Sequence, residues 1–318
     1  MGPFPARFMK APRSNLHLIA TDYLRELTVP RQHHFIVNTL ARSCTTARVN
    51  HVIRSLEARG IAVEVDSVTA PGEATKCATR ICSREEHPVI IVGGGDGTVN
   101  GVINGLPFGR ATVAVVPLGT ANVLAHEVGI RSLDDAVARI ATGATRTPAI
   151  GLLQADRKKH YFLLMAGVGL DGSICATVRS SEKTVLGKGA YLLAAVRHLA
   201  SWERERLEIY TEEMRIDCHS VIVCNSRHYG GNVVLAPDAD IFTPEFQVVC
   251  LKDDRRRSYL RLALNTLAGR YPETAEVRRF ITGKLVVTGR KAVQADGDFV
   301  TWSPVRISIV EQFFQLIV

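Results

Sequence analysis

Short apolar runs alternate with longer amphipathic stretches in the first half of the chain. The run Val-Ile-Ile-Val at 89–92 is apolar throughout, which is typical of a strand buried on both faces of a parallel sheet. Further strands are expected at 35–38, 61–66 and 112–116. Apolar residues at helical spacing predict helices over 47–59, 73–83, 98–104, 121–127 and 133–141. This alternation predicts an α/β domain with a parallel sheet.

The pattern changes beyond Pro148, where short β-like runs dominate. Strands are expected at 161–165, 207–210, 221–224, 232–235, 247–251, 284–288 and 305–310, and helices near 189–202 and 258–268. Residues 1–33 are Pro-rich at first and then carry a short helical stretch at 16–27. We expect an N-terminal extension at 1–33, an α/β domain at 34–148 and a β-rich domain at 149–318, whose last strand is free to return to the first domain.

A glycine-rich turn follows the apolar run at 89–92. Glycines 93 to 95 let the backbone turn and approach a ligand that a Cβ would hold away, and the next helix would direct free N–H groups at a phosphate. Asp96 lies inside this anion site, where a carboxylate is best explained by Mg²⁺ bridging it to a nucleotide. The turn therefore indicates metal-assisted phosphoryl transfer, and a turn that only closes a βαβ unit is the alternative. It is neither a P-loop nor a dinucleotide G-x-G-x-x-G.

A second turn of the same kind lies at 111–124, where an apolar strand meets a Pro/Gly break. It carries the hydroxyl of Thr120, and a helix is expected to begin at Asn122. Two such turns at the carboxyl ends of neighbouring parallel strands line one crevice, which is where α/β sheets bind ligands.

With both turns in view, the chain resembles the diacylglycerol kinase catalytic domain family, which includes YegS-like lipid kinases and sphingosine kinases. The resemblance covers roughly residues 34–300, and its motifs occur in the expected order. They are Gly-Gly-Asp-Gly-Thr-Val-Asn (94–100), Pro-Leu-Gly-Thr-Ala-Asn (117–122), Gly-Val-Gly-Leu-Asp (167–171), Gly-Lys-Gly-Ala-Tyr (187–191), Asn225 with Tyr-Gly-Gly (229–231), Ala-Pro-Asp-Ala (236–239) and Gln-Ala-Asp-Gly-Asp (294–298).

The chain departs from the family pattern in three places. Of the usual Asn-Pro-x-Ser-Gly after the first strand, only Asn38 remains. The acidic residues that hold a structural Mg²⁺ in the family are replaced by Phe-Thr-Pro-Glu-Phe-Gln at 242–247, so we expect that second metal site to be lost, with phenylalanines packing in its place. The last acid of the final motif is Asp298 instead of Glu, which sets the carboxylate back by one methylene.

The resemblance implies a β-sandwich for the second domain, ATP and Mg²⁺ as cofactors, and a role for each matching residue. Asp96 would hold the catalytic Mg²⁺, Asp298 would accept the proton with Asp296 beside it, and Asp171 would orient the lipid or cap a turn. The implied nucleotide contacts are Asn38, Thr69, Gly94, Gly95, Asp96, Gly97, Thr98, Asn100, Gly119 and Thr120. From its residues alone, Asp-Gly-Asp at 296–298 is equally typical of a β-hairpin turn.

Composition and charge fit a cytoplasmic enzyme that works at a membrane surface. Seven cysteines form no C-x-x-C pair, which favours free thiols in a reducing compartment, and no apolar run approaches 18 residues.

The net charge is +8, and residues 252–291 hold eleven Lys/Arg against four Asp/Glu. A basic amphipathic helix is expected there, which either attracts anionic lipid at the inner face of the membrane or packs on its own sheet. The basic residues lack interleaved aromatics, so no nucleic-acid partner is expected, and no pattern specifies an oligomeric state.

Three functions remain open from the sequence. The first is an ATP-dependent lipid kinase that phosphorylates a hydroxyl of diacylglycerol, a sphingoid base or a related lipid. The second is a NAD kinase-like enzyme, which shares Gly-Gly-Asp-Gly-Thr, although the chain lacks that family's Asn-Glu pair and carries the Pro-Leu-Gly-Thr-Ala-Asn of lipid kinases. The third is a non-catalytic lipid- or nucleotide-binding pseudokinase, motivated by the three departures.

Overall fold

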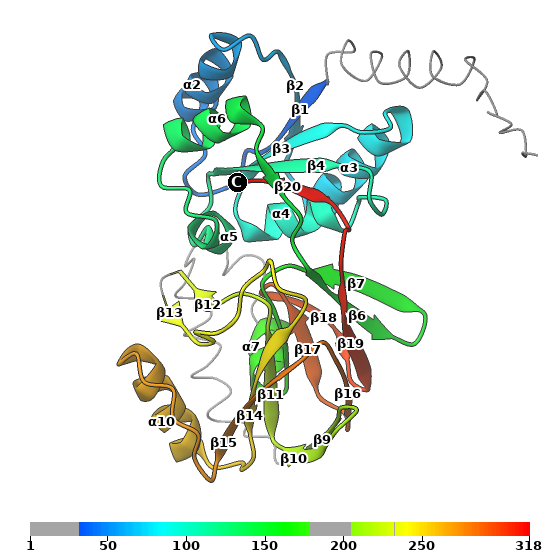
Figure 1. Cartoon of the computed structure of the whole chain (residues 1–318), viewed down its shortest axis with the longest axis vertical. Helices are drawn as coiled ribbons and strands as arrows, with labels where there is room; N and C mark the ends of the chain where they lie inside the picture. Colours follow the sequence, from blue (N-terminus) through cyan, green and yellow to red (C-terminus); the bar gives the residue numbers. More distant parts are fainter. Residues whose placement is uncertain (1–31, 178–204, 232) are drawn as a thin grey trace, which may run out of the picture.

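Two stacked halves make up the part of the chain that the computed structural model describes, which is residues 32–177, 205–231 and 233–318. The upper half in Figure 1 is a sheet with helices on both faces, and the lower half consists of two sheets packed face to face. The predicted α/β domain with a parallel sheet, followed by a β-sandwich, is therefore confirmed.

The first half is built on one six-stranded sheet. In spatial order its strands are β2 (Val63–Val68), β1 (His33–Asn38), β3 (Val89–Gly94), β4 (Thr112–Pro117), β20 (Gln315–Ile317) and β5 (Thr145–Arg146). The first five are parallel and β5 is antiparallel. Helices connect or cover the strands: α2 (Thr46–Glu57), α3 (Glu73–Arg84), α4 (Asp96–Ile103), α5 (Val123–Glu127) and α6 (Leu133–Thr142).

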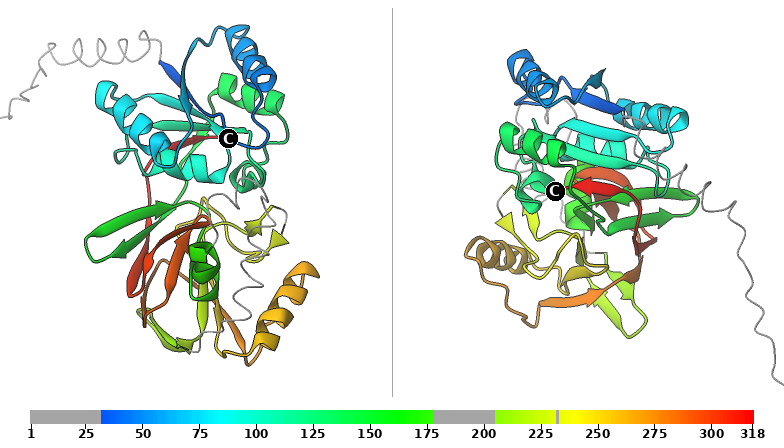
Figure 2. Two further views of the ribbon diagram at one scale, coloured as in Figure 1. Left: turned by 180° about the vertical axis from the view of Figure 1, so that it is seen from behind. Right: turned by 45° about the horizontal axis from the view of Figure 1, so that its top comes forward.

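Helices on both faces explain why β3 is apolar along its whole length. Helices α2 and α6 contact each other on one face, and α3 and α4 contact each other on the other, as Figures 1 and 2 show. All six residues of β3 are buried between these layers. A central strand of a parallel sheet has no solvent side, so the alternation of an amphipathic strand disappears.

The second half is a sandwich of two antiparallel six-stranded sheets. One sheet has the order β10 (Arg215–Cys218), β9 (Leu207–Tyr210), β16 (Lys284–Thr288), β19 (Val305–Val310), β6 (Ile150–Ala155) and β7 (Lys158–Phe162). The other has the order β15 (Val277–Thr282), β14 (Phe246–Leu251), β11 (Ser220–Cys224), β8 (Met165–Val168), β17 (Ala292–Ala295) and β18 (Asp298–Trp302). Phe162 and Phe246 stack between the sheets with ring centroids 5.7 Å apart.

Smaller elements complete the second half. They are α7 (Leu170–Thr177), the hairpin of β12 (His228–Gly230) and β13 (Val233–Val234), and α10 (Arg256–Leu267). Helix α7 packs against β17, and α10 contacts β13. No helix in the described part of the chain is long and apolar enough to cross a membrane.

The last strand leaves the sandwich and joins the first half. Figure 1 shows the red C-terminal segment rising from β19 to lie in the upper sheet, where β20 pairs with β4 and β5. Phe313, Phe314 and Leu316 are almost fully buried in the core of the first half. The two halves are thus connected by two chain crossings, one after β5 and one before β20.

Several elements differ from the expectation. Helix α7 was not predicted, and the unpredicted strands are β5, β6, β10, β12, β15, β17, β18 and β20. The run at 161–165 spans the end of β7 and the start of β8. Gly93 and Gly94 belong to β3 and not to a turn. Glycine is required at position 93 because a Cβ there would lie 2.7 Å from the Phe35 ring. The predicted helices at 16–27 and 189–202 lie outside the described residues.

Candidate active site

The two glycine-containing turns touch each other at the carboxyl ends of β3 and β4. A Cβ placed on Gly119 would lie 2.3 Å from Cα of Gly95, so only glycine allows this approach. The N–H of Leu118 donates to the carbonyl of Gly94 at 3.0 Å, which extends the pairing of the two strands into the turns. Asn122 adopts φ 48° and its Oδ1 accepts the N–H of Gly119 at 2.9 Å. The predicted crevice is therefore formed by backbone packed against backbone.

Asp96 is the first residue of α4, two residues earlier than the predicted helix start. Its Oδ1 accepts the N–H of Leu124 at 3.0 Å, so the carboxylate connects the β3 turn to α5. The side chain is half-buried and lines a cleft between the two halves. A carboxylate at the N-terminus of a helix interacts favourably with the helix dipole, which also supports an anion or a metal–phosphate complex nearby.

A cleft of about 610 Å³ separates the α/β half from the sandwich. Seven of the predicted site residues line it, and they come from both halves: Gly95, Asp96, Gly97, Thr120, Asp171, Asp296 and Asp298. Apolar side chains make up much of the remaining wall: Ala121, Val123, Leu164, Met165, Ile174 and Cys175. A cleft lined by acids from both halves and by apolar side chains suits a ligand with a polar head and an aliphatic body.

Asp298 projects into this cleft from the hairpin between β17 and β18. A Cβ placed on Gly97 would lie 3.9 Å from its Oδ2, so the carboxylate faces the start of α4 across the cleft. Asp296 and Gly297 take φ values of 48° and 86°, which is the geometry of a tight hairpin turn. The interpretation of Asp-Gly-Asp as a hairpin turn is therefore confirmed, and this turn places Asp298 at the cleft.

Asp296 does not have the arrangement of a catalytic carboxylate, contrary to the expectation. Its two oxygens accept N–H groups from Leu163, Leu164, Met165 and the Asn100 amide, at 2.8–3.0 Å. Burial raises its pKa to about 6, and these donors oppose the rise. With every hydrogen-bonding direction directed into the protein, Asp296 is a positioning residue that fixes the hairpin bearing Asp298.

The side chain of Asn100, which was expected to bind phosphate, is engaged by groups of the protein. Its amide nitrogen donates to Asp296 at 2.8 Å and to the carbonyl of Tyr161 at 2.9 Å, and its Oδ1 accepts the Asn104 amide at 3.1 Å. The side chain is buried and points from α4 into the sandwich. These hydrogen bonds connect α4 of the first half to β7 and the β17–β18 hairpin of the second half.

Other predicted nucleotide residues support the turns from outside the cleft lining. The Asn38 amide donates to Oγ1 of Thr98 at 3.0 Å, which ties the end of β1 to α4. A Cβ on Gly94 would lie 2.5 Å from the same Thr98 hydroxyl, so glycine is required there. Thr69 is exposed after β2, and its N–H donates to Glu73 at 2.6 Å in a cap of α3. Like Gly119, these residues do not line the cleft.

Asp171 lies deep in the cleft with partners that the sequence did not single out. Its carboxylate accepts the Tyr229 hydroxyl and the Gln294 amide, and burial raises its pKa. Glu127 of α5 accepts both the N–H and Nδ1 of His228, at 2.9 and 2.6 Å, which joins the halves at the same end of the cleft. Tyr229 and Gln294 stood in the quoted motifs, so their positions were visible although their contacts with Asp171 were not.

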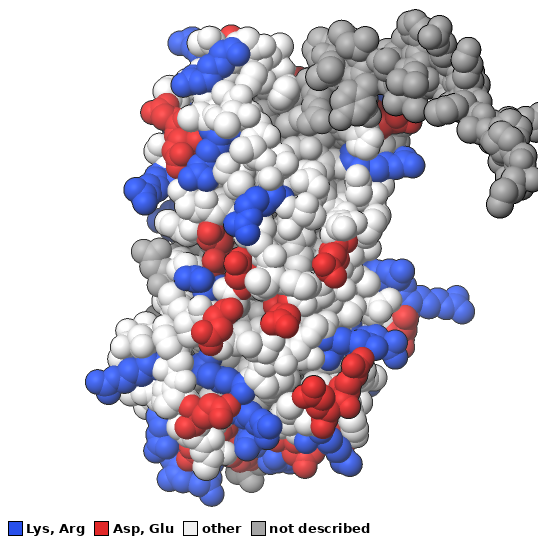
Figure 3. Space-filling view, in the orientation of Figure 1, with Lys and Arg blue, Asp and Glu red and all other residues white. Residues whose placement is uncertain are grey.

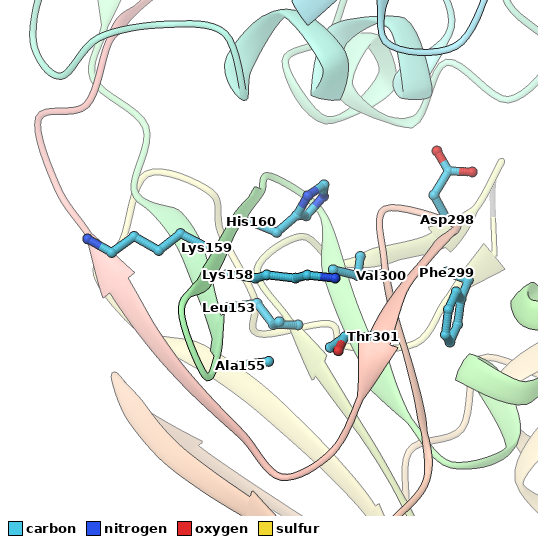
Figure 4. A pocket seen from close by; sticks show the side chains of 9 residues that line it. All are labelled: Leu153, Ala155, Lys158, Lys159, His160, Asp298, Phe299, Val300 and Thr301. Atoms are coloured by element: carbon cyan, nitrogen blue, oxygen red, sulfur yellow. The ribbon is translucent and has the colours of Figure 1, made fainter.

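A second cavity of about 380 Å³ adjoins Asp298 from the side of the sandwich. Figure 4 shows His160 and Asp298 on its rim, with Lys158 and Thr301 further in. Nε2 of His160 is buried without a hydrogen-bond partner among the described residues, and burial lowers the ring's pKa while the Asp298 carboxylate opposes this. Asp298 thus lies between two cavities. No sequence pattern indicated that His160 would lie beside it.

The segment expected to have lost a metal site is held by protein contacts. The Gln247 amide donates to Asp238 at 2.8 Å, and its Oε1 accepts the Asp238 N–H at 3.1 Å. The Arg146 guanidinium lies 3.6 Å from the centre of the Phe242 ring. No cluster of three or more His, Cys, Asp or Glu side chains able to hold a metal occurs in the described residues. A magnesium site at Asp96 does not require one, because Mg²⁺ often binds through one or two carboxylates and substrate phosphates.

Phosphate-sized turns on an α/β sheet, facing a carboxylate from a β-sandwich across an apolar cleft, define the class of two-domain kinases that act on lipids or nucleotides. Residues 32–153 match the family described as diacylglycerol kinase catalytic domain, and residues 165–318 match the YegS C-terminal NAD kinase beta sandwich-like domain. The chain belongs to the diacylglycerol kinase catalytic domain family, as its motifs indicated.

Relatives and solved structures support the same assignment. A diacylglycerol kinase of Bacillus subtilis (strain 168) is 32% identical over 241 residues, which cover 73% of this chain and 77% of that protein. A diacylglycerol kinase of Mycobacterium tuberculosis (strain ATCC 25618 / H37Rv) is 26% identical over 291 residues, covering 89% and 93%. The crystal structure of a diacylglycerol kinase from Bacillus anthracis str. Sterne has a TM-score of 0.69 at 19% identity and covers 90% of this chain and 96% of its own, which shows a shared fold.

Proposed function

We propose that this protein is an ATP-dependent lipid kinase that transfers the γ-phosphate of ATP to a hydroxyl of diacylglycerol, a sphingoid base or a related lipid. The observation that carries the proposal is the pairing of Asp96 and Asp298 across one cleft, one from each half. The apolar wall beside these acids suits an aliphatic acceptor. The relatives named as diacylglycerol kinases support the same chemistry.

The residues would divide the work between the two halves. Backbone N–H groups at Gly95 and Gly97 would receive phosphate oxygens at the start of α4, and Thr120 would contact the nucleotide from the second turn. Asp96 would hold Mg²⁺, which when bound neutralises phosphate charge during transfer. Asp298 would accept the proton of the acceptor hydroxyl, a contribution that is modest beside correct positioning in phosphoryl transfer.

Residues around these groups would position them. The two turns would be kept in place by contacts of Asn38, Gly94, Thr98 and Gly119. Thr69 would contact the nucleotide from the carboxyl end of β2. Asp171 would orient the polar head of the lipid through the network that it shares with Tyr229 and Gln294. We also propose that the domains span residues 34–148 and 149–318, with β20 joining the sheet of the first domain. We further propose a cytoplasmic location at the inner face of the membrane.

The alternatives have less support. No match or relative described above points to a NAD kinase as a whole, and the apolar cleft wall has no evident use in binding a dinucleotide. Against a pseudokinase, Asp96 and Asp298 both line the cleft despite the shortened acid.

One assay separates the three functions. Purified protein with labelled ATP and Mg²⁺ is offered a lipid panel and NAD in parallel, and label is expected in lipid only. Label in NAD would favour the second function, and bound ATP with no label anywhere would favour the third.

Asp96→Asn is expected to abolish turnover with the fold retained, because Asn keeps an oxygen for the Leu124 N–H but loses the charge that binds a hard cation. Asp134→Asn, on the exposed first turn of α6, is the matched control. Turnover at the wild-type rate in Asp96→Asn would remove Asp96 from the mechanism.

A further inference from the structure

Helix α10 exposes three leucines while two of its small polar residues are buried. Ser258 and Thr266 are buried, whereas Leu260, Leu264 and Leu267 are 61%, 58% and 70% exposed. A surface helix normally turns its apolar residues to the core and its small polar residues to water. The sequence alone left open whether the leucines of this helix pack on the protein, and the structure shows that these three do not.

The three leucines form one stripe. Their spacing of four and three residues places them within roughly 60° of one another around the helix axis. The opposite side of α10 holds the helix in place, because Tyr259 and Leu262 pack against the small apolar cluster beside β11 and β14. Single exposed leucines are ordinary on a protein surface, but a stripe opposite a well-packed face marks a binding surface.

Positive charge surrounds the stripe. Residues 255–270 contain five arginines and no Asp or Glu, and the arginines at 255, 256, 257 and 261 are all exposed. Arg261 lies 3.5 Å from Glu276, a loose contact at the edge of the helix. Figure 3 shows Lys and Arg gathered over α10 at the lower left of the molecule. Arginines flanking leucines match the layering of an anionic bilayer, where phosphate headgroups lie above hydrocarbon.

We propose that α10 docks the protein on an anionic lipid bilayer, with Leu260, Leu264 and Leu267 entering the interface and the neighbouring arginines contacting lipid phosphates. A second copy of this chain is a poorer occupant, because a symmetric dimer through this face would bring two sets of arginines together. The inference deepens the proposed function and rests on it, since it supplies the surface from which a lipid acceptor is drawn.

One hairpin connects helix α10 to the part of the cleft wall that contains Tyr229. Helix α10 contacts β13, which pairs with β12, and β12 contributes Tyr229 and Gly230 to the cleft wall. Docking through α10 therefore holds the cleft within a short distance of the bilayer, and it does so without using any residue assigned to the reaction.

Vesicle flotation of the full-length protein tests the proposal. The wild type is expected to float with vesicles of phosphatidylglycerol and phosphatidylcholine and much less with phosphatidylcholine alone. The variant L260Q/L264Q/L267Q is expected to lose partitioning on the order of a hundredfold or more, because Gln keeps helix propensity and removes apolar area. The variant R256Q/R257Q/R261Q should lose about fivefold per arginine on anionic vesicles only, and added salt should mimic it.

Controls separate this proposal from the proposed function. Both variants should keep wild-type circular dichroism and wild-type rates on a short-chain diacylglycerol in detergent micelles, and Val65→Thr, an exposed apolar site on β2, should float normally. Normal flotation of the leucine variant would overturn docking through α10. A wild-type protein that is dimeric in solution, with a leucine variant that is monomeric, would also overturn it. Flotation that depends on α10 in a protein without kinase activity would uphold docking and overturn the proposed function.

Discussion

At the scale of single residues, the carboxylates of the cleft differ in what their oxygens contact. Asp298 is exposed at the cleft, whereas both oxygens of Asp296 are taken up by N–H donors of the protein. Sequence proximity suggested that the two acids share a role, but their surroundings differ, since N–H donors engage both oxygens of Asp296 while Asp298 faces Gly97 across the cleft. The acid that can reach a substrate is the one that continues into β18.

Asp298→Asn is expected to lower kcat by about 10²-fold or more with little change in Tm, because an exposed group that accepts a proton is lost while the turn is kept. Asp298→Glu is the matched variant, which restores the length typical of the family and should retain most activity. Steady-state kinetics on a micellar lipid measure both. Equal kcat in Asp298→Asn and the wild type would show that the proton leaves by another route.

Asp296 should make stability depend on pH in a defined window. Its folded pKa of about 6 lies above the ordinary value of 3.8, so between about pH 4 and 6 the folded protein retains a proton that the unfolded chain has released. Its contribution to the free energy of unfolding therefore falls as pH rises through this window, by on the order of 3 kcal/mol, and is constant above it.

Asp296→Asn removes this titration. The difference in unfolding free energy between wild type and variant, measured by denaturant titration at several pH values, should decrease from pH 4 to 6. The variant should also be less stable at every pH, because an amide NH₂ in place of Oδ1 cannot accept the N–H groups of Leu164 and Met165. A difference that stays flat with pH would mean that Asp296 is already ionised throughout.

At the scale of elements, the two strand-to-helix turns act as one unit because their backbones touch. A Cβ on Gly119 would lie 2.3 Å from Cα of Gly95, so no side chain fits at Gly119. The turns also share side-chain contacts, since Asp96 accepts the N–H of Leu124 at the start of α5. The geometry of the anion site is therefore set by the packing of β3 beside β4 and not by either turn alone.

Gly119→Ala is expected to lower stability by about 1–3 kcal/mol and to weaken ATP binding, because the new Cβ would displace the backbone at Gly95. Gly283→Ala is the matched control, since its Cβ would meet its nearest atom at an ordinary 3.4 Å. Thermal unfolding and nucleotide titration measure the two effects. A Gly119→Ala protein that binds ATP normally would contradict the need for this close approach.

At the scale of the whole molecule, the first half depends on the end of the chain. Strand β20 fills the place between β4 and β5, and Phe313, Phe314 and Leu316 complete the core there. The contacts of Asn100 with Asp296 and of Glu127 with His228 further join the halves on either side of the cleft. The cleft between them is consequently a fixed part of the fold.

A chain ending at residue 310 is therefore expected to unfold in its first half at a lower temperature, or not to fold, because β4 loses one of its two neighbouring strands and three large apolar side chains leave the core. Calorimetry and hydrogen exchange of β3 and β4 measure this. Glu311→Gln, an exposed position in the same segment, is the control. Unchanged protection of β3 and β4 in the shortened chain would show that the first half folds by itself.

The sequence predicted most of the first half because its signals are local. Strand β3 could be predicted from four consecutive apolar residues because both of its faces are buried. The Pro/Gly break before Thr120 predicted the second turn. The sandwich was less predictable, since strands β6 and β15 alternate weakly and pair with partners distant in the chain. His160 had no signal at all, because its burial beside Asp298 arises only when β7 and β18 meet at the edge of the sandwich.

The sequence by itself determined the class of fold, the two phosphate-sized turns and the family, because glycine, aspartate and apolar runs act through neighbours along the chain. The tertiary structure alone decided which of these residues reach the cleft. It turned Asn100 away from the cleft, engaged both oxygens of Asp296 with N–H donors of the protein, brought Asp298 opposite Gly97, and left the leucines of α10 facing water. Those outcomes depend on which segments pack together, and a hydrogen bond or a burial between distant residues has no periodicity that the chain could reveal.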